Sequence, residues 1–232
     1  MEERLQKILS RYGVSSRRQA EVLLQEGRVR VNGNTARVGD SADDTEDVIE
    51  VDGVRLKKLP PQIVLMLNKP RGYVTTMQDE KGRKNVSELV ADCGHRVYPV
   101  GRLDLFSEGL LLMTNDGELA NRLTHPKGEV KKIYHVWVSH YYDGAERSLS
   151  DSIVIDGRKS IPAKIRLLHR KDQTAMLEVE LSEGRNRQIR RLCEHAGVTV
   201  TRLKRIKEGN LELRDLPVGK WRLLTEDEIG KL

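Results

Sequence analysis

The sequence predicts an α+β protein in which a small N-terminal unit precedes a larger C-terminal one. Two observations support this fold class. In the first sixty residues, apolar positions first recur at helical spacing and then alternate as in strands. After residue 62, apolar runs of strand length are interspersed with short helical patterns.

Two helices are predicted to open the N-terminal unit. The apolar residues of segment 5–12 recur at helical spacing, and Gly13 ends that pattern. Ser16 followed by Gln19 is typical of a capping box, so a second helix begins there. Gly27 stands where a helix commonly ends in a left-handed residue.

A hairpin is predicted to follow the second helix. Arg and Val alternate over residues 28–31, and Asn32-Gly33 favours a tight turn. The return strand is expected at 35–38, and another short strand at 48–51.

Composition then changes at residue 54. The segment 54–61 holds two lysines and two prolines and is predicted to be a linker. It separates a first domain, residues 1–53, from a second domain, residues 62–232.

The second domain is predicted from strands and from one amphipathic helix. Strands are predicted at 63–67, 109–113, 134–138 and 175–181, and the first two of these are continuously apolar. A short helix is predicted at 118–123. The apolar residues of segment 189–196 share one helical face, the arginines around them lie off it, and Gly197 ends the helix. Gly184 is expected to allow a close backbone approach, with an anion seated at the helix N-terminus.

The charge distribution points to a polyanionic partner. The net charge is +6, and the segment 185–207 holds eight basic residues and one acidic residue. Such a cluster is typical of nucleic-acid binding, although a solvated basic face is the simpler alternative. With 38% hydrophobic and 33% charged residues, the composition argues against disorder of the whole chain.

Other protein classes are disfavoured. The chain has no apolar run of about 18 residues and no signal peptide at its N-terminus, so neither a membrane protein nor a secreted one is expected. Two cysteines far apart make a zinc site or a disulfide framework improbable and fit a cytoplasmic protein.

The first fifty residues resemble the RNA-binding module first seen in ribosomal protein S-four. The resemblance rests on the segments 4–9, 15–20 and 27–33. It implies that basic side chains of the second helix and the following strand contact structured RNA, namely Arg17, Arg18, Arg28 and Arg30. The alternative is that these arginines only solubilise a small αβ unit.

The rest of the chain resembles the pseudouridine synthases, in the branch of the ribosomal RNA enzymes RsuA and RluB. Asp104 alone would be read as a turn former, but it stands among several ordered motifs. These motifs are Asn68-Lys69-Pro70-Arg71-Gly72, Gly101-Arg102-Leu103-Asp104, Ser107-Glu108-Gly109-Leu110, Thr124-His125-Pro126, Tyr134-His135-Val136 and the segment 184–190. The resemblance implies a mixed, mostly antiparallel sheet flanked by helices.

The resemblance also implies a reaction, the isomerisation of uridine to pseudouridine in ribosomal RNA. Asp104 would be the essential carboxylate, acting as nucleophile or as base. Tyr134 would stack on the base, and Arg185 would pair with Asp104, or Arg187 or Arg190 if the helix register differs. His125 is expected to be structural.

The remaining expectations concern substrate and partners. Large-subunit RNA is slightly favoured over small-subunit RNA, and the rival function is a non-catalytic RNA-binding or ribosome-assembly protein. No metal, organic cofactor or membrane is implied, and a monomer suffices. Further RNA contacts are expected from Lys69, Arg71, Arg102, Arg187, Arg190 and Arg191, and the alternative for Lys69 is a structural role.

Two departures from the family pattern lie beside Asp104. Ser107 stands where relatives usually have Thr, which keeps the hydroxyl group. Phe106 stands where a polar residue is common, so it either packs beside the pocket or alters which nucleotide is accepted.

Overall fold

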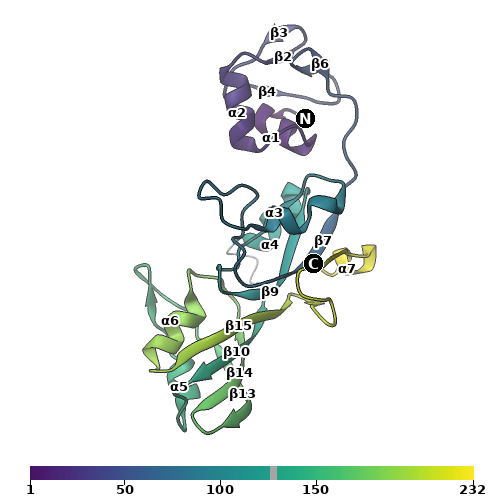
Figure 1. Cartoon of the computed structure of the whole chain (residues 1–232). Helices are drawn as coiled ribbons and strands as arrows, with labels where there is room; N and C mark the ends of the chain where they lie inside the picture. Colours follow the sequence, from purple (N-terminus) through teal and green to yellow (C-terminus); the bar gives the residue numbers. More distant parts are fainter. Residues whose placement is uncertain (126–129) are drawn as a thin grey trace. The chain divides into compact units, whose positions relative to one another are not determined.

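The computed structural model describes residues 1–125 and 130–232 in two units (Figure 1). The N-terminal unit comprises Met1–Gln62 and Asn115–Gly117, and the C-terminal unit comprises Ile63–Thr114 and Glu118–Leu232. The predicted α+β class is confirmed. Pro126, the last residue of one sequence motif, lies outside the described residues. No helix in the described ranges is long and apolar enough to cross a membrane.

The N-terminal unit begins with the two predicted helices. They are α1 (Leu5–Arg11) and α2 (Arg17–Gln25), and the Ser16 side chain accepts a hydrogen bond of 3.1 Å from the backbone N–H of Gln19. This bond satisfies one of the free N–H groups at the start of α2. Before α1, the short strand β1 (Glu3–Arg4) pairs with β4 (Ser41–Ala42). The apolar faces of both helices form the core of this unit.

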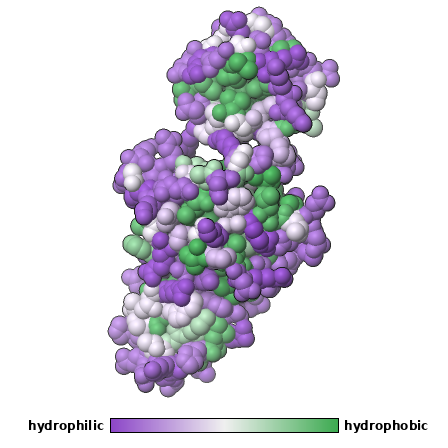
Figure 2. All heavy atoms as spheres, turned by 45° about the vertical axis from the view of Figure 1, so that its right-hand side comes forward, coloured by the Kyte–Doolittle hydropathy of each residue, from purple (hydrophilic) through white to green (hydrophobic). Residues whose placement is uncertain are grey.

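A four-stranded sheet covers the two helices. Its strand order is β3 (Asn34–Thr35), β2 (Val29–Val31), β5 (Ile49–Val51) and β6 (Val54–Arg55). Asn32 and Gly33 both have positive φ, as the tight hairpin turn requires. In Figure 2, hydrophilic residues surround an apolar centre on the visible face of this unit.

Two predicted boundaries in this unit are wrong. The return strand stops at Thr35 instead of Val38, because the Asp40 carboxylate accepts the Arg37 backbone N–H at 2.8 Å and closes a turn there. The predicted linker starts too early, because Val54 and Arg55 form β6 and pair with β5.

The C-terminal unit contains a nine-stranded sheet. Its main strand order is β13-β14-β10-β15-β9-β7-β17, with β16 paired to β15 and β8 paired to β9. Every pairing is antiparallel except that of β9 with β15, which is parallel. The bounds are β7 Val64–Lys69, β8 Tyr98–Val100, β9 Glu108–Thr114, β10 Lys132–Ser139, β13 Lys164–Lys171, β14 Thr174–Leu181, β15 Thr199–Glu208, β16 Leu211–Glu212 and β17 Trp221–Leu223.

Short helices and a hairpin accompany this sheet. The helices are α3 (Val86–Leu89), the 3-10 turn η1 (Ala91–Cys93), α4 (Gly117–Thr124), α5 (Ala145–Leu149), α6 (Gln188–His195) and α7 (Glu226–Gly230). Strands β11 (Val154–Ile155) and β12 (Arg158–Lys159) form a separate hairpin.

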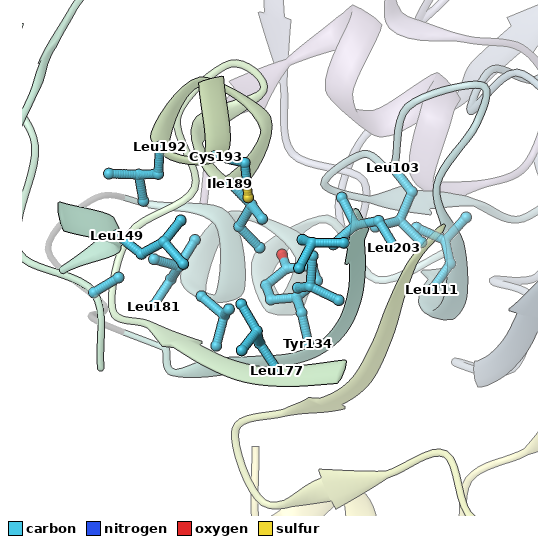
Figure 3. Packing of buried hydrophobic residues seen from close by; sticks show 14 of the residues in the cluster. Leu103, Leu111, Tyr134, Leu149, Leu177, Leu181, Ile189, Leu192, Cys193 and Leu203 are labelled. Atoms are coloured by element: carbon cyan, nitrogen blue, oxygen red, sulfur yellow. The ribbon is translucent and has the colours of Figure 1, made fainter. Parts of the chain in front are cut away.

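Two apolar clusters explain why the predicted strands at 63–67 and 109–113 are continuously apolar. One face of β7 and β9 belongs to the cluster that contains Leu65 and Leu111, and the other face belongs to the cluster that contains Met66 and Leu112. Strands covered on both faces lack a polar side. In the first cluster, residues of α5 and α6 pack onto β10, β14 and β15 (Figure 3). The predicted apolar face of α6 is confirmed by the burial of Ile189, Leu192 and Cys193.

Gly109 allows β9 and β15 to approach each other. It has φ +102°, and a Cβ atom there would lie 2.8 Å from the Arg205 backbone nitrogen and closer still to the Arg205 carbonyl oxygen. The pairing of Gly109 with Arg205 is one of the two pairs in the parallel junction. Glycine at this position therefore permits the junction between the two halves of the sheet.

Replacing Gly109 with alanine is expected to destabilise the protein by about 2–4 kcal/mol, because the Cβ collides with backbone at a strained φ. The free energy of unfolding in urea measures this. Gly184→Ala is the matched control: a Cβ atom at Gly184 meets nothing within 4 Å, so its stability should stay within about 0.5 kcal/mol of wild type. Equal stability of both variants would contradict the argument.

Candidate active site

Asp104 lies in a short turn that the backbone holds in place. The Ser107 N–H donates to the Asp104 carbonyl oxygen at 3.0 Å and closes the turn of residues 104–107, here called the 104–107 loop. The Gly72 N–H donates to the Leu105 carbonyl at 2.7 Å. Just before the loop, the buried Thr75 hydroxyl donates to the Leu103 carbonyl at 2.6 Å. The loop therefore has little freedom to move relative to the end of β7.

Lys69 supplies the central support of the 104–107 loop. It is the last residue of β7, has no exposed surface, and donates from Nζ to three carbonyl oxygens: Asp104 at 3.1 Å, Ser107 at 2.9 Å and Pro70 at 3.1 Å. Burial lowers the pKa of Lys69 from 10.5 to about 8, while the charges of Asp104 and Glu108 oppose the change. The prediction that Lys69 contacts RNA is wrong, because its three donors are occupied inside the protein.

Two arginines of the α6 region face the Asp104 carboxylate. Oδ2 of Asp104 lies 3.7 Å from Nη1 of Arg187 and 3.9 Å from Nε of Arg190. The Asp104 side chain is 36% exposed, so it remains open to an incoming molecule. Burial and the positive charges of Arg187 and Arg71 lower the pKa of Arg190, whereas Asp104 raises it. Asp104 is thus the anion within a group of cations.

Arg185, the predicted partner of Asp104, is engaged elsewhere. Its Nε donates to Glu183 at 2.8 Å, and its Nη1 donates to the Arg158 carbonyl at 2.9 Å. The first choice for the ion pair is therefore wrong, and the alternatives named with it, Arg187 and Arg190, occupy the position. The reason is local: an acidic residue two positions earlier captures the Arg185 side chain.

The close backbone approach predicted at Gly184 is not found among the described residues. Gly184 does not have a positive φ, and no atom of the described ranges lies within 4 Å of a Cβ position built on it. Helix α6 begins only at Gln188, and the left-handed residue before it is Arg187, with φ +50°. The chain therefore turns at Arg187, which directs that side chain and Arg190 toward Asp104.

Tyr134 forms part of a polar floor beneath the site. It lies on β10 and is 8% exposed, and burial raises the pKa of its hydroxyl while the Arg205 guanidinium opposes the change. Arg205 on β15 donates from Nε to the Leu110 carbonyl at 2.7 Å, and its Nη2 lies 3.3 Å from a Glu208 carboxylate oxygen. Lys132 lies 3.8 Å from the same carboxylate group. The floor is therefore charged, although it is buried.

A β-bulge places these residues on one face. Tyr134 pairs with Arg205 and Ile133 with Lys207, so β15 has one extra residue between them. Arg205 and Glu208 consequently point to the same side although they are three positions apart. Sequence reasoning missed both residues. Arg205 stands in the basic stretch 185–207 and Glu208 directly follows it, and neither carries a signal that separates it from surface charges.

These residues line one cavity. Its volume is about 700 Å³, and its walls include Asp104, Tyr134, Arg187, Arg190 and Arg205. Sites for small molecules commonly have volumes of 300–1,000 Å³. The motif residues Thr124 and His125 also reach its wall. The arrangement can accept a compact polar group and hold a carboxylate against it.

The other arginines predicted to contact RNA differ in whether their side chains are already paired with carboxylates of the protein. Arg17, Arg18, Arg30, Arg71 and Arg102 are exposed. Arg28 is also exposed, but it forms a two-point ion pair with Asp52 at 2.7 and 2.8 Å, and Asp52 and Glu26 raise its pKa. Arg191 binds Asp156 at 3.2 Å.

The fold and the site together define an enzyme that acts on RNA. The sequence pattern of the RNA pseudouridylate synthase family matches residues 63–195, so the chain belongs to this family and isomerises uridine in RNA. The pattern of the S4 domain matches residues 3–49, the N-terminal unit. Asp104, Tyr134 and both arginines lie within the first match.

Individual relatives agree with this family. A protein of Bacillus subtilis (strain 168) named ribosomal large subunit pseudouridine synthase B is 42% identical over 233 residues, which cover 99% of this chain and 95% of the relative. The protein of that name from Vibrio vulnificus is 38% identical over all of this chain and 75% of its own length. A crystal structure described as that of a pseudouridylate synthase covers 98% of both chains with a TM-score of 0.68 and 29% identity.

Replacing Lys69 with methionine is expected to change how stability depends on pH. The pKa of Lys69 is about 8 in the folded protein and about 10.4 in an unfolded chain, so the folded state binds fewer protons between these values. The stability of wild type relative to Lys69→Met should therefore rise from pH 8 to pH 10, by up to about 1.4 kcal/mol per pH unit.

Urea unfolding of both proteins at pH 7.5, 8.5 and 9.5 measures this difference. Lys81→Met is the matched control, because Lys81 is an exposed lysine of the same unit. A stability difference between wild type and Lys69→Met that stays constant with pH would contradict the assignment.

Proposed function

We propose that this protein converts a uridine of large-subunit ribosomal RNA to pseudouridine, with Asp104 as the essential carboxylate. The observation that carries the proposal is the position of Asp104, which is partly exposed in a cavity of about 700 Å³ and lies within 4 Å of two guanidinium groups. The named relatives act on large-subunit RNA according to their names, which favours that substrate over small-subunit RNA.

The target uridine must leave its helix to reach Asp104. A stacked base is inaccessible to a carboxylate at a cavity wall, so the nucleotide is flipped into the cavity at a cost of a few kcal/mol. Contacts of Arg187 and the exposed arginines with phosphates, together with contact between the base and Tyr134, offset this cost. The carboxylate of Asp104 then acts on the ribose, as nucleophile or as base, while the base detaches, rotates and rejoins through carbon.

The arginines beside Asp104 have separate tasks in this proposal. Arg190 is mostly buried, with 17% of its side chain exposed, so it holds the carboxylate from the protein side. Arg187 is 50% exposed and can contact both Asp104 and RNA. Because Arg187, Arg190 and Asp104 supply the charges at the reacting centre, we propose that the reaction needs no metal or organic cofactor.

The N-terminal unit is proposed to bind structured RNA through exposed arginines. Arg17, Arg18 and Arg30 are exposed and form no ion pair within the described part of the chain, whereas Arg28 is partly neutralised by Asp52. Such phosphate contacts position the enzyme without reading sequence. The protein would act as a cytoplasmic monomer on ribosomal RNA, free or in a pre-ribosomal particle.

Replacing Asp104 with asparagine is expected to abolish product formation and to preserve RNA binding. Asparagine keeps the shape of the side chain but can act neither as a nucleophile nor as a base at this site. Tritium release from ribosomal RNA labelled at C5 of uridine measures turnover, and filter binding measures affinity. Release by the variant at the wild-type rate would refute the role of Asp104, and binding without release by either protein would indicate the non-catalytic alternative.

Replacing Arg190 with glutamine is expected to lower kcat by about 10²–10³-fold, because the developing charge near Asp104 loses a fixed donor. Arg185→Gln is the matched comparison in the same segment, and its kcat should fall much less, since Arg185 binds Glu183 and the Arg158 carbonyl instead. Steady-state tritium release gives kcat and KM for both variants. A larger loss of kcat in Arg185→Gln than in Arg190→Gln would instead support Arg185 as the partner of Asp104.

A further inference from the structure

Phe106 is an exposed aromatic side chain two residues from Asp104. It is 56% exposed, and it is the only phenylalanine of the chain. A single exposed apolar side chain is common on protein surfaces. The place of Phe106 beside Asp104 leaves an aromatic face open to a molecule that reaches the site. Phe106 is therefore not buried beside the pocket, and more than half of its surface is open to solvent.

The backbone around Phe106 is held on both sides. Lys69 binds the carbonyls of Asp104 and Ser107, Gly72 binds the carbonyl of Leu105 at 2.7 Å, and Nη2 of Arg190 binds the carbonyl of Phe106 itself at 3.3 Å. The side chain therefore projects from a fixed backbone. A contact made from a pre-organised loop loses little conformational entropy on binding.

Phe106 lies outside the cavity that receives the uridine. The cavity wall includes Asp104 and Ser107, which flank the tip of the loop, but not Phe106. Arg190 donates to the Phe106 carbonyl, and the positive charge of Arg71 is near enough to Arg190 to lower the pKa of Arg190. The surroundings of the ring are thus suited to a nucleotide with its phosphate, next to the one inside the cavity.

We propose that Phe106 stacks on a nucleobase adjacent to the flipped uridine. When a uridine leaves its stack, its neighbour loses a stacking partner, and an aromatic ring at the cavity rim can replace that partner. Every base has a π-face, so this contact tolerates any base and positions the strand without reading its sequence. The inference rests on the proposed function, because it takes the substrate to be RNA with an everted uridine.

Four variants of Phe106 separate stacking from other roles. Phe106→Tyr and Phe106→Trp keep an aromatic ring. Phe106→Leu removes the ring but keeps an apolar side chain, and Phe106→Ala removes nearly the whole side chain. With large-subunit ribosomal RNA transcribed in vitro, tritium release is expected to give a KM for the Leu variant about tenfold above wild type. The Ala variant should resemble Leu, the two ring-bearing variants should stay within about twofold of wild type, and kcat should change little in all four.

Two controls keep the test specific. Tyr142→Leu removes an exposed aromatic, 44% exposed and outside the cavity wall, and should leave KM unchanged. Thermal unfolding should show the same midpoint for wild type and all four Phe106 variants, because the side chain is exposed. A wild-type KM for Phe106→Leu would overturn the proposal, as would equal losses in the Leu and Tyr variants.

Affinity distinguishes failure of this inference from failure of the proposed function. The dissociation constant of the same RNA is measured in the Asp104→Asn background, with and without Phe106→Leu, at fixed salt. Stacking predicts about tenfold weaker binding by the double variant, whether or not the transcript is turned over. Equal affinities would overturn the stacking role, whereas a wild-type protein that binds this RNA without turnover would refute only the proposed activity.

Discussion

The geometry of the site depends on one buried ammonium group. Lys69 stands at the end of β7, a strand whose residues are all buried and which lies between β9 and β17. Two of its three hydrogen bonds to carbonyl oxygens reach Asp104 and Ser107 and fix the 104–107 loop relative to the sheet. A charged lysine without exposed surface is costly unless its donors are satisfied and a counter-charge is near. The carbonyls supply the first condition, and Asp104 and Glu108 supply the second. Asp104, the carboxylate proposed to act in the reaction, therefore also helps to keep its own support charged.

The other wall of the cavity depends on how β15 is placed. The parallel contact at Gly109 brings Arg205 against β9, where its Nε binds the Leu110 carbonyl. The bulge opposite Tyr134 then turns both Arg205 and Glu208 toward the cavity. The glycine at position 109 and the bulge in β15 together place charged side chains beneath the cavity. Neither feature alone would suffice, because the first sets the distance of β15 and the second sets the direction of its side chains.

The elements that follow from local patterns could be predicted from the sequence, but several contacts of the site could not. Helices α2 and α6 and strands β7 and β9 are encoded in their own apolar spacing and caps, which is why they were predicted closely. The partner of Asp104 depends on where α6 begins, and the left-handed Arg187 shifts that start beyond Arg185. Arg205 and Glu208 depend on a bulge defined by pairing with β10. Such long-range registers have no local signature, so a basic residue buried beneath Tyr134 looks the same in the sequence as one exposed to solvent.

The distinction between buried and exposed basic residues also changes how the positive charge of segment 185–207 is interpreted. The segment 185–207 has eight basic residues, but structural contacts occupy several of them: Arg205 is buried, Arg185 binds Glu183, and Arg202 binds Glu108 and stacks on Trp137 at 4.6 Å. A cation already paired inside the protein neutralises no phosphate, and only neutralised phosphates release counterions. We therefore expect the salt dependence of RNA binding to reflect the exposed cations of the chain, while the buried ones set the shape and charge of the cavity. A charge cluster in a sequence thus combines two populations, one that attracts RNA and one that builds the site, and burial separates them.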